Sequence, residues 1–107
     1  MTTIKKSKKN ALVTGGARRV GKAIALHLAR SGYDVGVHYG TSAEDALKTK
    51  MEIESLGQKC FLYKADLSNP AEIETMFLEI STNVSMIDIL VNSAAVMPKS
   101  DLMKISP

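Results

Sequence analysis

The stretch ALVTGGARRVGKAIALHLARSG, Ala11 to Gly32, decides how this sequence folds. It begins with a short apolar run that ends at Gly15, and apolar residues then recur at helical spacing until Gly32. This pattern predicts a strand, a glycine-rich turn and a helix. The N-terminus of such a helix presents unpaired N–H groups and the positive end of the helix dipole, which together favour phosphate binding. A glycine-rich turn alone is weak support for a phosphate site, because it also occurs as a plain connection.

The remaining sequence repeats the alternation of strand and helix. Apolar runs rich in β-branched residues predict strands at residues 10–15, 34–39, 59–66 and 87–92. Each strand and the helix after it span about 30 residues, the usual length of a right-handed crossover between parallel strands. The sequence therefore predicts an α/β fold, namely the N-terminal β-α-β-α-β-α-β portion of a Rossmann-type, doubly wound parallel sheet. The expected strand order is 3-2-1-4.

The spacing of apolar residues also predicts which side chains the three helices bury. The second helix opens at Ser42 and stops at Gly57, and the third has Asn69 as its N-cap, followed by Pro70. The expected buried side chains are Val20, Ile24 and Leu28 in the first helix, Leu47, Met51, Ile53 and Leu56 in the second, and Ile73, Met76, Phe77 and Ile80 in the third.

Composition and charge restrict the classes of function. The chain has 107 residues, of which 45% are hydrophobic, and a net charge of +3, which suits one globular domain at residues 10–107. Residues 1–9 form a basic leader arm that contains Lys5, Lys6, Lys8 and Lys9. The arm has no aromatic or amphipathic companion, so neither a nucleic acid nor a membrane is an expected partner. A basic interaction protein that uses this arm is the least favoured hypothesis for its function.

Targeting signals and cysteine chemistry are not expected from this sequence. Arg18, Arg19 and Lys22 interrupt the apolar residues after the arm, so no signal or transmembrane segment is predicted, and the expected location is the cytoplasm. Cys60 is the only cysteine, which excludes a disulfide within the chain and a cysteine-rich metal site. We expect Cys60 to be a small core residue, and we expect no metal.

Several ordered motifs resemble the short-chain dehydrogenase/reductase family. The fingerprint of that family is Thr-Gly, three residues, Gly, any residue and Gly, and this chain has Thr14 and Gly15, then Arg19, then Gly21. The resemblance continues through ADL at residues 65–67 and DILVNSAA at residues 88–95. It implies a nicotinamide dinucleotide cofactor and hydride transfer to a small carbonyl or imine substrate.

The resemblance also implies roles for the ends of the third and fourth strands. Asp66 would contact the adenine, and Asn92 to Ala95 would lie beside the cofactor. The usual form of the last motif is Asn-Asn-Ala-Gly, so Ser93 and Ala95 are departures, and the Cβ of Ala95 crowds the backbone approach to the ribose. From the residues alone, Asp66 is equally well interpreted as a turn or capping residue, and Asn92 as a strand-ending turn residue.

Arg19 stands where the family usually has its second glycine. Arg18-Arg19-Val20-Gly21 resembles the turn of the pteridine-reductase branch, and a 3-oxoacyl-carrier-protein-reductase-like branch is the other resemblance. A guanidinium offers several donors to phosphate oxygens. Enzymes that prefer NAD place an acid about 20 residues beyond the turn to hold the ribose 2′-hydroxyl. Residues 38–42, HYGTS, contain no acid, so NADPH is the expected cofactor.

The residues expected to bind the cofactor all lie at or just after the carboxyl end of one of the four predicted strands. A histidine such as His38 is more often structural than a ligand, and it contributes little to this prediction by itself. The expected cofactor-binding residues are Gly15, Arg18, Arg19, Val20, Gly21, His38, Tyr39, Thr41, Ser42, Ala65, Asp66, Leu67, Asn92, Ser93, Ala94 and Ala95.

No catalytic residue is expected in this chain. The family's proton donor is a tyrosine with a lysine four residues later, but Tyr33, Tyr39 and Tyr63 are followed at that spacing by Val, Ala and Leu. We therefore expect the chain to be truncated before the segment that contains the family's catalytic residues. Two hypotheses for the function stay open. The chain is either the N-terminal part of an NADPH-dependent oxidoreductase or a dinucleotide-binding module without catalytic activity of its own. The substrate, whether a pteridine, an acyl thioester or a ketone, also stays open.

The fourth strand is expected to lie at the edge of the sheet. Residues 87–92 are mostly apolar and have Asp88 as their only charged side chain. An apolar edge strand exposes unpaired backbone groups to other chains. We therefore expect either marginal stability or self-association into a homo-oligomer through this strand.

Overall fold

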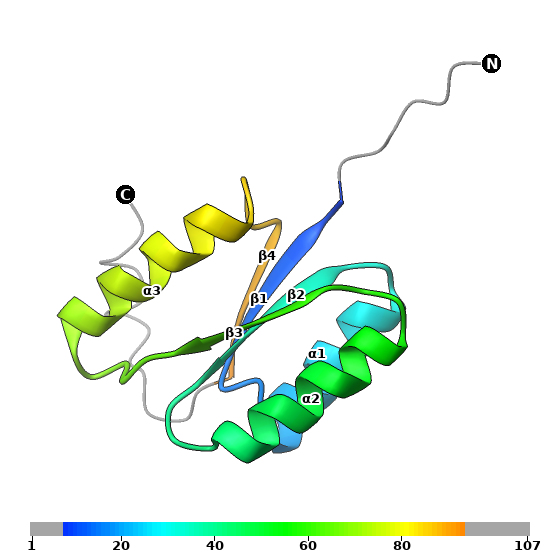
Figure 1. Cartoon of the computed structure of the whole chain (residues 1–107), viewed down its shortest axis with the longest axis horizontal. Helices are drawn as coiled ribbons and strands as arrows, with labels where there is room; N and C mark the ends of the chain where they lie inside the picture. The colour runs from blue at the N-terminus through cyan, green and yellow to red at the C-terminus, as the bar shows by residue number, and fades with distance from the viewer. Residues whose placement is uncertain (1–7, 94–107) are drawn as a thin grey trace.

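Four parallel strands form one sheet in the computed structural model, which describes residues 8–93 (Figure 1). The elements follow one another as β1 (Asn10–Thr14), α1 (Arg19–Arg30), β2 (Asp34–Tyr39), α2 (Ala43–Ser55), β3 (Cys60–Lys64), α3 (Pro70–Asn83) and β4 (Ile89–Asn92). The strand order is β3-β2-β1-β4, so the predicted α/β fold and its 3-2-1-4 order are confirmed. Strands β2 and β3 are added on one side of β1 and β4 on the other, so the strand order changes direction between β1 and β4, next to the turn that follows β1.

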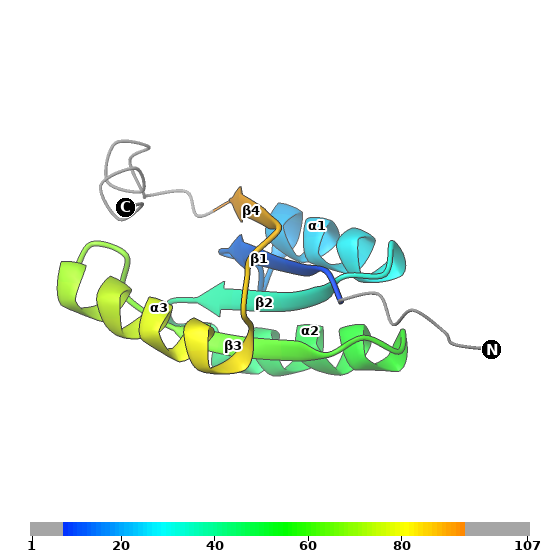
Figure 2. The same ribbon diagram turned by 90° about the horizontal axis from the view of Figure 1, so that it is seen from above.

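The helices lie on both faces of the sheet. Helices α1 and α2 cover one face and α3 covers the other, as the view from above shows (Figure 2). Alternate residues of the strands supply the two cores. Val13, Val35 and Val37 pack with Ala25, Ala29 and Ile53 beneath α1 and α2, whereas Leu12 and Tyr63 pack with Ile73, Met76 and Ile80 beneath α3.

The buried face of α1 agrees with the prediction in part, and the buried face of α2 differs from it. In α1 the fully buried residues are Gly21, Ala25 and Ala29. The predicted Ile24 and Leu28 are partly buried and pack against the core, whereas Val20 is 69% exposed. In α2 the buried residues are Ala46, Thr49 and Ile53, whereas Leu47, Met51 and Leu56 are exposed. Of the four residues predicted for α2, only Ile53 was right. Small side chains let both helices approach the sheet closely, and this requirement outweighs side-chain size in choosing the buried face.

Helix α3 agrees closely with the prediction. Asn69 is its N-cap, with the side-chain oxygen accepting a hydrogen bond from the backbone N–H of Ala71 at 3.0 Å, and Pro70 occupies the first helical position. Ile73, Met76 and Ile80 are buried and Phe77 is partly buried. Sequence and structure agree here because the aliphatic stripe is unbroken and nothing smaller competes for the sheet face.

Cys60 is a core residue, as predicted. Its side chain is buried in the cluster beneath α1 and α2, and burial raises the pKa of the thiol to about 12. A thiol with so high a pKa is protonated near neutral pH and is unreactive. Among residues 8–93, no group of three or more His, Cys, Asp or Glu side chains is arranged to hold a metal ion.

Strand β4 lies at the edge of the described sheet. It pairs with β1 on one side, and no strand among residues 8–93 pairs with its other side. Leu90 is 40% exposed, because α3 lies over β3 rather than over β4. The carboxylate of Asp88 accepts a hydrogen bond from the backbone N–H of Asn10 at 2.8 Å, so it closes the start of the β1–β4 pair. Self-association through this edge stays a prediction.

The burial of α2 can be tested with two truncations on one helix. Ile53→Ala should lower the free energy of unfolding by about 2–5 kcal/mol, because it leaves a cavity in the core. Leu47→Ala is the matched control, and it should change the free energy by less than about 0.5 kcal/mol because Leu47 is 55% exposed. Urea unfolding followed by circular dichroism measures both. A larger loss for Leu47→Ala would mean that α2 presents its other face to the sheet.

Candidate functional site

A pocket of about 780 Å³ opens at the carboxyl ends of the strands. It is formed by the turns after β1, β2 and β3 together with the residue after β4. The lining residues are Gly15, Ala17, Arg18, Arg19, Val20, Gly21, His38, Tyr39, Gly40, Thr41, Ser42, Ala65, Asp66, Leu67 and Ser93. Four segments that are far apart in the sequence therefore meet at one site, as expected for ligand sites in open α/β sheets.

Most of the predicted site residues line this pocket. Asn92 does not; its side-chain oxygen accepts a hydrogen bond from the Thr14 hydroxyl at 2.8 Å and joins the ends of β1 and β4. Ala94 and Ala95 lie outside the described residues. Ala17 and Gly40 line the pocket but were not predicted. Their only sequence signal is that they stand inside the same two turns as the predicted residues.

The β1–α1 turn brings the start of α1 against the end of β1. A Cβ on Gly21 would lie 2.0 Å from the carbonyl oxygen of Gly15 and 2.6 Å from the hydroxyl of Ser93, so only glycine fits at position 21. Gly15 has a φ of 64°, which glycine adopts without strain. The close contact at Gly21 brings the first turn of α1 to the wall of the pocket.

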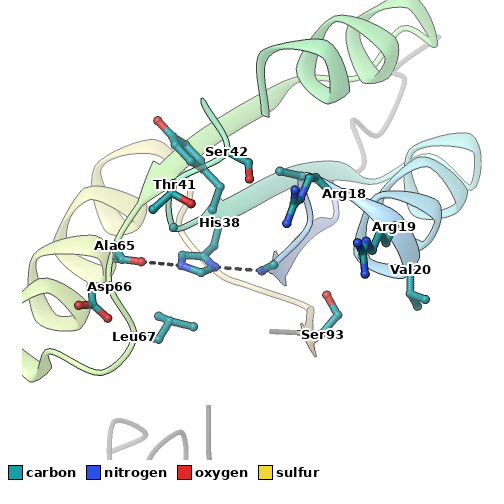
Figure 3. Close-up of a pocket in the computed structure, with 15 residues that line it drawn as sticks. Arg18, Arg19, Val20, His38, Thr41, Ser42, Ala65, Asp66, Leu67 and Ser93 are labelled. Atoms are coloured by element: carbon teal, nitrogen blue, oxygen red, sulfur yellow. Dashed lines mark hydrogen bonds between the residues drawn. The ribbon is translucent and has the colours of Figure 1, made fainter. Parts of the chain in front are cut away.

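The first turn of α1 is open to an anion. Its N-cap residue, Arg18, makes no side-chain capping bond, and the first turn contains no acidic residue. The unpaired N–H groups and the helix dipole therefore face the pocket without a competing carboxylate from α1. Arg18, Arg19 and Val20 form one wall of the pocket, and Ala65, Asp66 and Leu67 form the opposite wall (Figure 3).

Side chains from neighbouring elements hold the turn in place. The Thr49 hydroxyl of α2 donates to the carbonyl oxygen of Ala17 at 2.9 Å, and both groups are buried. The Ser93 hydroxyl donates a short hydrogen bond to the carbonyl oxygen of Thr14. In this chain Ser93, a departure from the family's second asparagine, thus serves to bind the end of β1.

Arg18 has one ionic neighbour. Its Nε lies 3.8 Å from the Asp45 carboxylate in the first turn of α2, and both side chains are more than 40% exposed. An exposed pair at this distance stabilises the fold by less than about 1 kcal/mol.

His38 lies between the two walls of the pocket rather than at its mouth. Its Nδ1 accepts a hydrogen bond from the backbone N–H of Gly15 at 2.9 Å, and its Nε2 lies 2.9 Å from the carbonyl oxygen of Ala65 (Figure 3). The ring is 4% exposed. Burial lowers the pKa of the imidazole, and the hydrogen bond to Ala65 partly opposes that shift. Both ring nitrogens have protein partners, which fits the structural interpretation of this histidine.

Asp66 is both a turn residue and a pocket residue. One carboxylate oxygen accepts hydrogen bonds from the Ser68 hydroxyl at 2.6 Å and the Ser68 backbone N–H at 2.9 Å. These bonds hold the pKa of the exposed carboxyl below its usual value. The two interpretations of Asp66 are compatible, because the turn orients a charged side chain that also lines the pocket.

Comparison with known proteins gives the family. A sequence profile of the short chain dehydrogenase family matches residues 9–107. The chain belongs to that family. A 3-oxoacyl-[acyl-carrier-protein] reductase, FabG, of Staphylococcus aureus (strain Mu50) is 37% identical over 99 residues, which cover 92% of this chain. The chain spans 40% of the length of that relative. Of the two branches that the sequence resembles, the 3-oxoacyl-reductase-like one thus has a supporting relative.

Two further similar proteins bear on the site. The homolog YusS of Bacillus subtilis (strain 168) is 37% identical over 97 residues, which cover 88% of this chain and 89% of YusS. The crystal structure of a putative dehydrogenase from Burkholderia cenocepacia with bound NADP superposes with a TM-score of 0.75 at 31% identity. That likeness covers 80% of this chain and 34% of the other.

No helix among residues 8–93 is long and apolar enough to cross a membrane.

The backbone at Arg19 allows a direct test of the turn. Arg19 has a φ of 54°, a left-handed conformation that costs a residue with a Cβ about 1–2 kcal/mol. Arg19→Gly removes this strain but increases the entropy of the unfolded chain, so it should stabilise the fold by about 0.5–1 kcal/mol. Arg19→Ala is the control, because it removes the charge and keeps the Cβ. We expect Arg19→Ala to have the wild-type stability in thermal melts, and a stabilised Arg19→Ala would contradict the strain argument.

Proposed function

We propose that the pocket binds NADP(H) and that residues 10–107 are the cofactor-binding part of an NADPH-dependent short-chain oxidoreductase. The observation that carries the proposal is the charge of the pocket. Arg18 and Arg19 stand at the open start of α1, and the end of β2 that faces them has no acidic side chain. The dinucleotide-binding fold of the family and the NADP-bound relative support the choice of cofactor.

The residues of the pocket fit the parts of such a dinucleotide. The N–H groups at the start of α1 would hold the pyrophosphate, and Gly15 and Gly21 keep side chains away from it. Arg18, Thr41 and Ser42 offer donors for a ribose 2′-phosphate beyond the end of β2. Asp66 and Leu67 lie on the wall where the adenine would rest. The volume of about 780 Å³ is within the range of cofactor sites.

The reaction proposed for the complete enzyme is reduction of a small carbonyl or imine substrate. A nicotinamide dinucleotide supplies the hydride for that reduction when it is bound. The residues of this chain bind the cofactor and orient it at the carboxyl edge of the sheet. The substrate is a pteridine, an acyl thioester or a ketone. The name of the relative FabG, 3-oxoacyl-[acyl-carrier-protein] reductase, favours the acyl thioester.

Cofactor preference tests the proposal. The chain should bind NADPH about tenfold more tightly than NADH, because a charge-assisted contact to the extra phosphate contributes about 1.5–3 kcal/mol. Arg18→Ala should reduce that preference. Asp45→Asn is the matched variant in the opposite direction, because it removes the carboxylate 3.8 Å from Arg18 and should increase the preference. Isothermal titration with both cofactors measures these changes. Equal affinities in the wild type would remove the basis of the proposal.

A second candidate function is a dinucleotide-binding module without chemistry of its own. Like the first candidate, it is compatible with a sequence that has no tyrosine followed four residues later by lysine. The observation that favours it is YusS, a relative of which this chain covers 89% of the length. The two candidates share the cofactor site and differ in whether a catalytic segment accompanies it.

Activity of the 107-residue chain is the corresponding test. Neither candidate gives this chain a proton donor, so it should not oxidise NADPH in the presence of a carbonyl substrate above the rate without protein. Absorbance at the nicotinamide band, followed with an acyl thioester, a pteridine and a ketone in turn, measures this. Substrate-dependent oxidation by the purified chain would show that another residue supplies the proton.

A further inference from the structure

The imidazole of His38, at the end of β2, joins two turns that are far apart in the sequence. Its Nδ1 accepts from the backbone N–H of Gly15 in the β1–α1 turn, and its Nε2 bonds the carbonyl oxygen of Ala65 after β3, both at 2.9 Å. The backbone carbonyl of His38 also accepts from the N–H of Gly16 at 3.1 Å. His38 thus connects the wall that contains Arg18 and Arg19 to the wall that contains Asp66 (Figure 3).

The two partners determine the protonation state of the ring. A backbone N–H can only donate and a carbonyl oxygen can only accept, so Nδ1 must be unprotonated and Nε2 must carry the hydrogen. The ring is therefore neutral. A second proton would turn Nδ1 into a donor that faces the N–H of Gly15, and that hydrogen bond would be lost. The ring is 4% exposed, so water has little room to replace the lost partner.

The charged groups around the ring do not stabilise its protonated form. Those that line the same pocket are Arg18 and Arg19 from the β1–α1 turn and Asp66 from the end of β3. None of them is a cause of the shift in the pKa of His38, which is lowered by burial and partly restored by the bond to Ala65. The lining residues from the end of β2 and from Ser93 carry no charge.

We propose that His38 is a positioning residue that holds the β1–α1 turn ready for the dinucleotide only while its imidazole is neutral, so that acid opens the turn and weakens binding. The proposal rests on the proposed cofactor site and adds a pH dependence to it. His38 does not bind the phosphate; it uses both ring nitrogens to place Gly15 and Ala65, whose neighbours line the two walls.

The direction of the pH dependence follows from the two states of the chain. In the unfolded chain the imidazole has its ordinary pKa of about 6.5, and in the folded chain the pKa is lower. The stability that the neutral ring contributes is complete above pH of about 6.5, and it is lost as the pH falls from there through the lower folded pKa. Dinucleotide affinity should fall over the lower part of that range, where the folded ring gains its proton.

Non-titrating variants separate the two hydrogen bonds. In His38→Asn the side-chain oxygen reaches the position of Nδ1, so it can accept from Gly15 at every pH. In His38→Gln the amide nitrogen reaches the position of Nε2, so it can donate to Ala65 but leaves Gly15 without its acceptor. His27→Asn is the control, because His27 is exposed on α1 and its loss changes the net charge in the same way.

The binding experiment uses NADH between pH 7.5 and pH 5.0. NADH is the probe because the 2′-phosphate of NADPH itself titrates near pH of about 6. We expect the wild type and His27→Asn to lose affinity about tenfold on acidification, and His38→Asn to change less than about twofold. His38→Gln should bind weakly at every pH. The same pH profile in wild type and His38→Asn, or a constant wild-type affinity, would overturn the proposal.

A second measurement does not depend on the cofactor. The amide resonance of Gly15 in the NMR spectrum should lose its hydrogen-bonded shift on acidification in the wild type and keep it in His38→Asn, while circular dichroism confirms that the chain stays folded. If no dinucleotide binds, the proposed cofactor site fails and the behaviour of Gly15 still decides the role of His38. A Gly15 resonance that does not respond to the titration of His38 would overturn it.

Discussion

The close contact between the start of α1 and the end of β1 is the constraint on which the rest of the site depends. At Gly21 a Cβ would lie 2.0 Å from the carbonyl oxygen of Gly15, so the helix can begin at this place only without a side chain there. That contact brings the unpaired N–H groups at the start of α1 to the wall of the pocket. If α1 began farther away, the same arginines would stand on the surface without a helix terminus beside them.

The turn is held by polar groups that belong to other elements. His38 from β2, Thr49 from α2 and Ser93 after β4 each bond a backbone group of residues 14–17. Each bond also satisfies a backbone donor or acceptor that would otherwise be costly where it is buried. The shape of the turn is therefore a property of the assembled sheet, and a ligand would meet a turn that is already ordered.

The chain corresponds to one functional part of its family. The pocket needs the carboxyl ends of β1, β2, β3 and β4, and all four strands are within residues 10–92. In open α/β sheets, ligands bind at the point where the strand order changes direction, which here lies between β1 and β4. Chemistry on a substrate needs further groups, and the chain spans 40% of the length of a relative such as FabG.

The sequence by itself determined the order of the elements, the strand order and most of the pocket. Strand and helix periods differ, and the glycine-rich turn and Asn69 cap mark the boundaries, so local patterns were sufficient for the order of the elements. The strand order was expected because it is the usual one in doubly wound sheets. Family motifs then pointed to the strand ends that line the site. Local patterns failed where close packing decided the outcome, because Ala46 and Thr49 rather than Leu47 and Met51 face the sheet.

Only the tertiary structure decided what His38 and Asn92 do. Both were among the expected cofactor-binding residues, with a structural role as the alternative, and each has hydrogen-bond partners 23 or more residues away in the sequence. Hydrogen bonds between strand ends depend on the register and spacing of the sheet, which no local pattern contains. The positive φ of Arg19 is likewise set by the approach of α1 to β1, since the sequence alone shows an arginine and not the backbone that carries it.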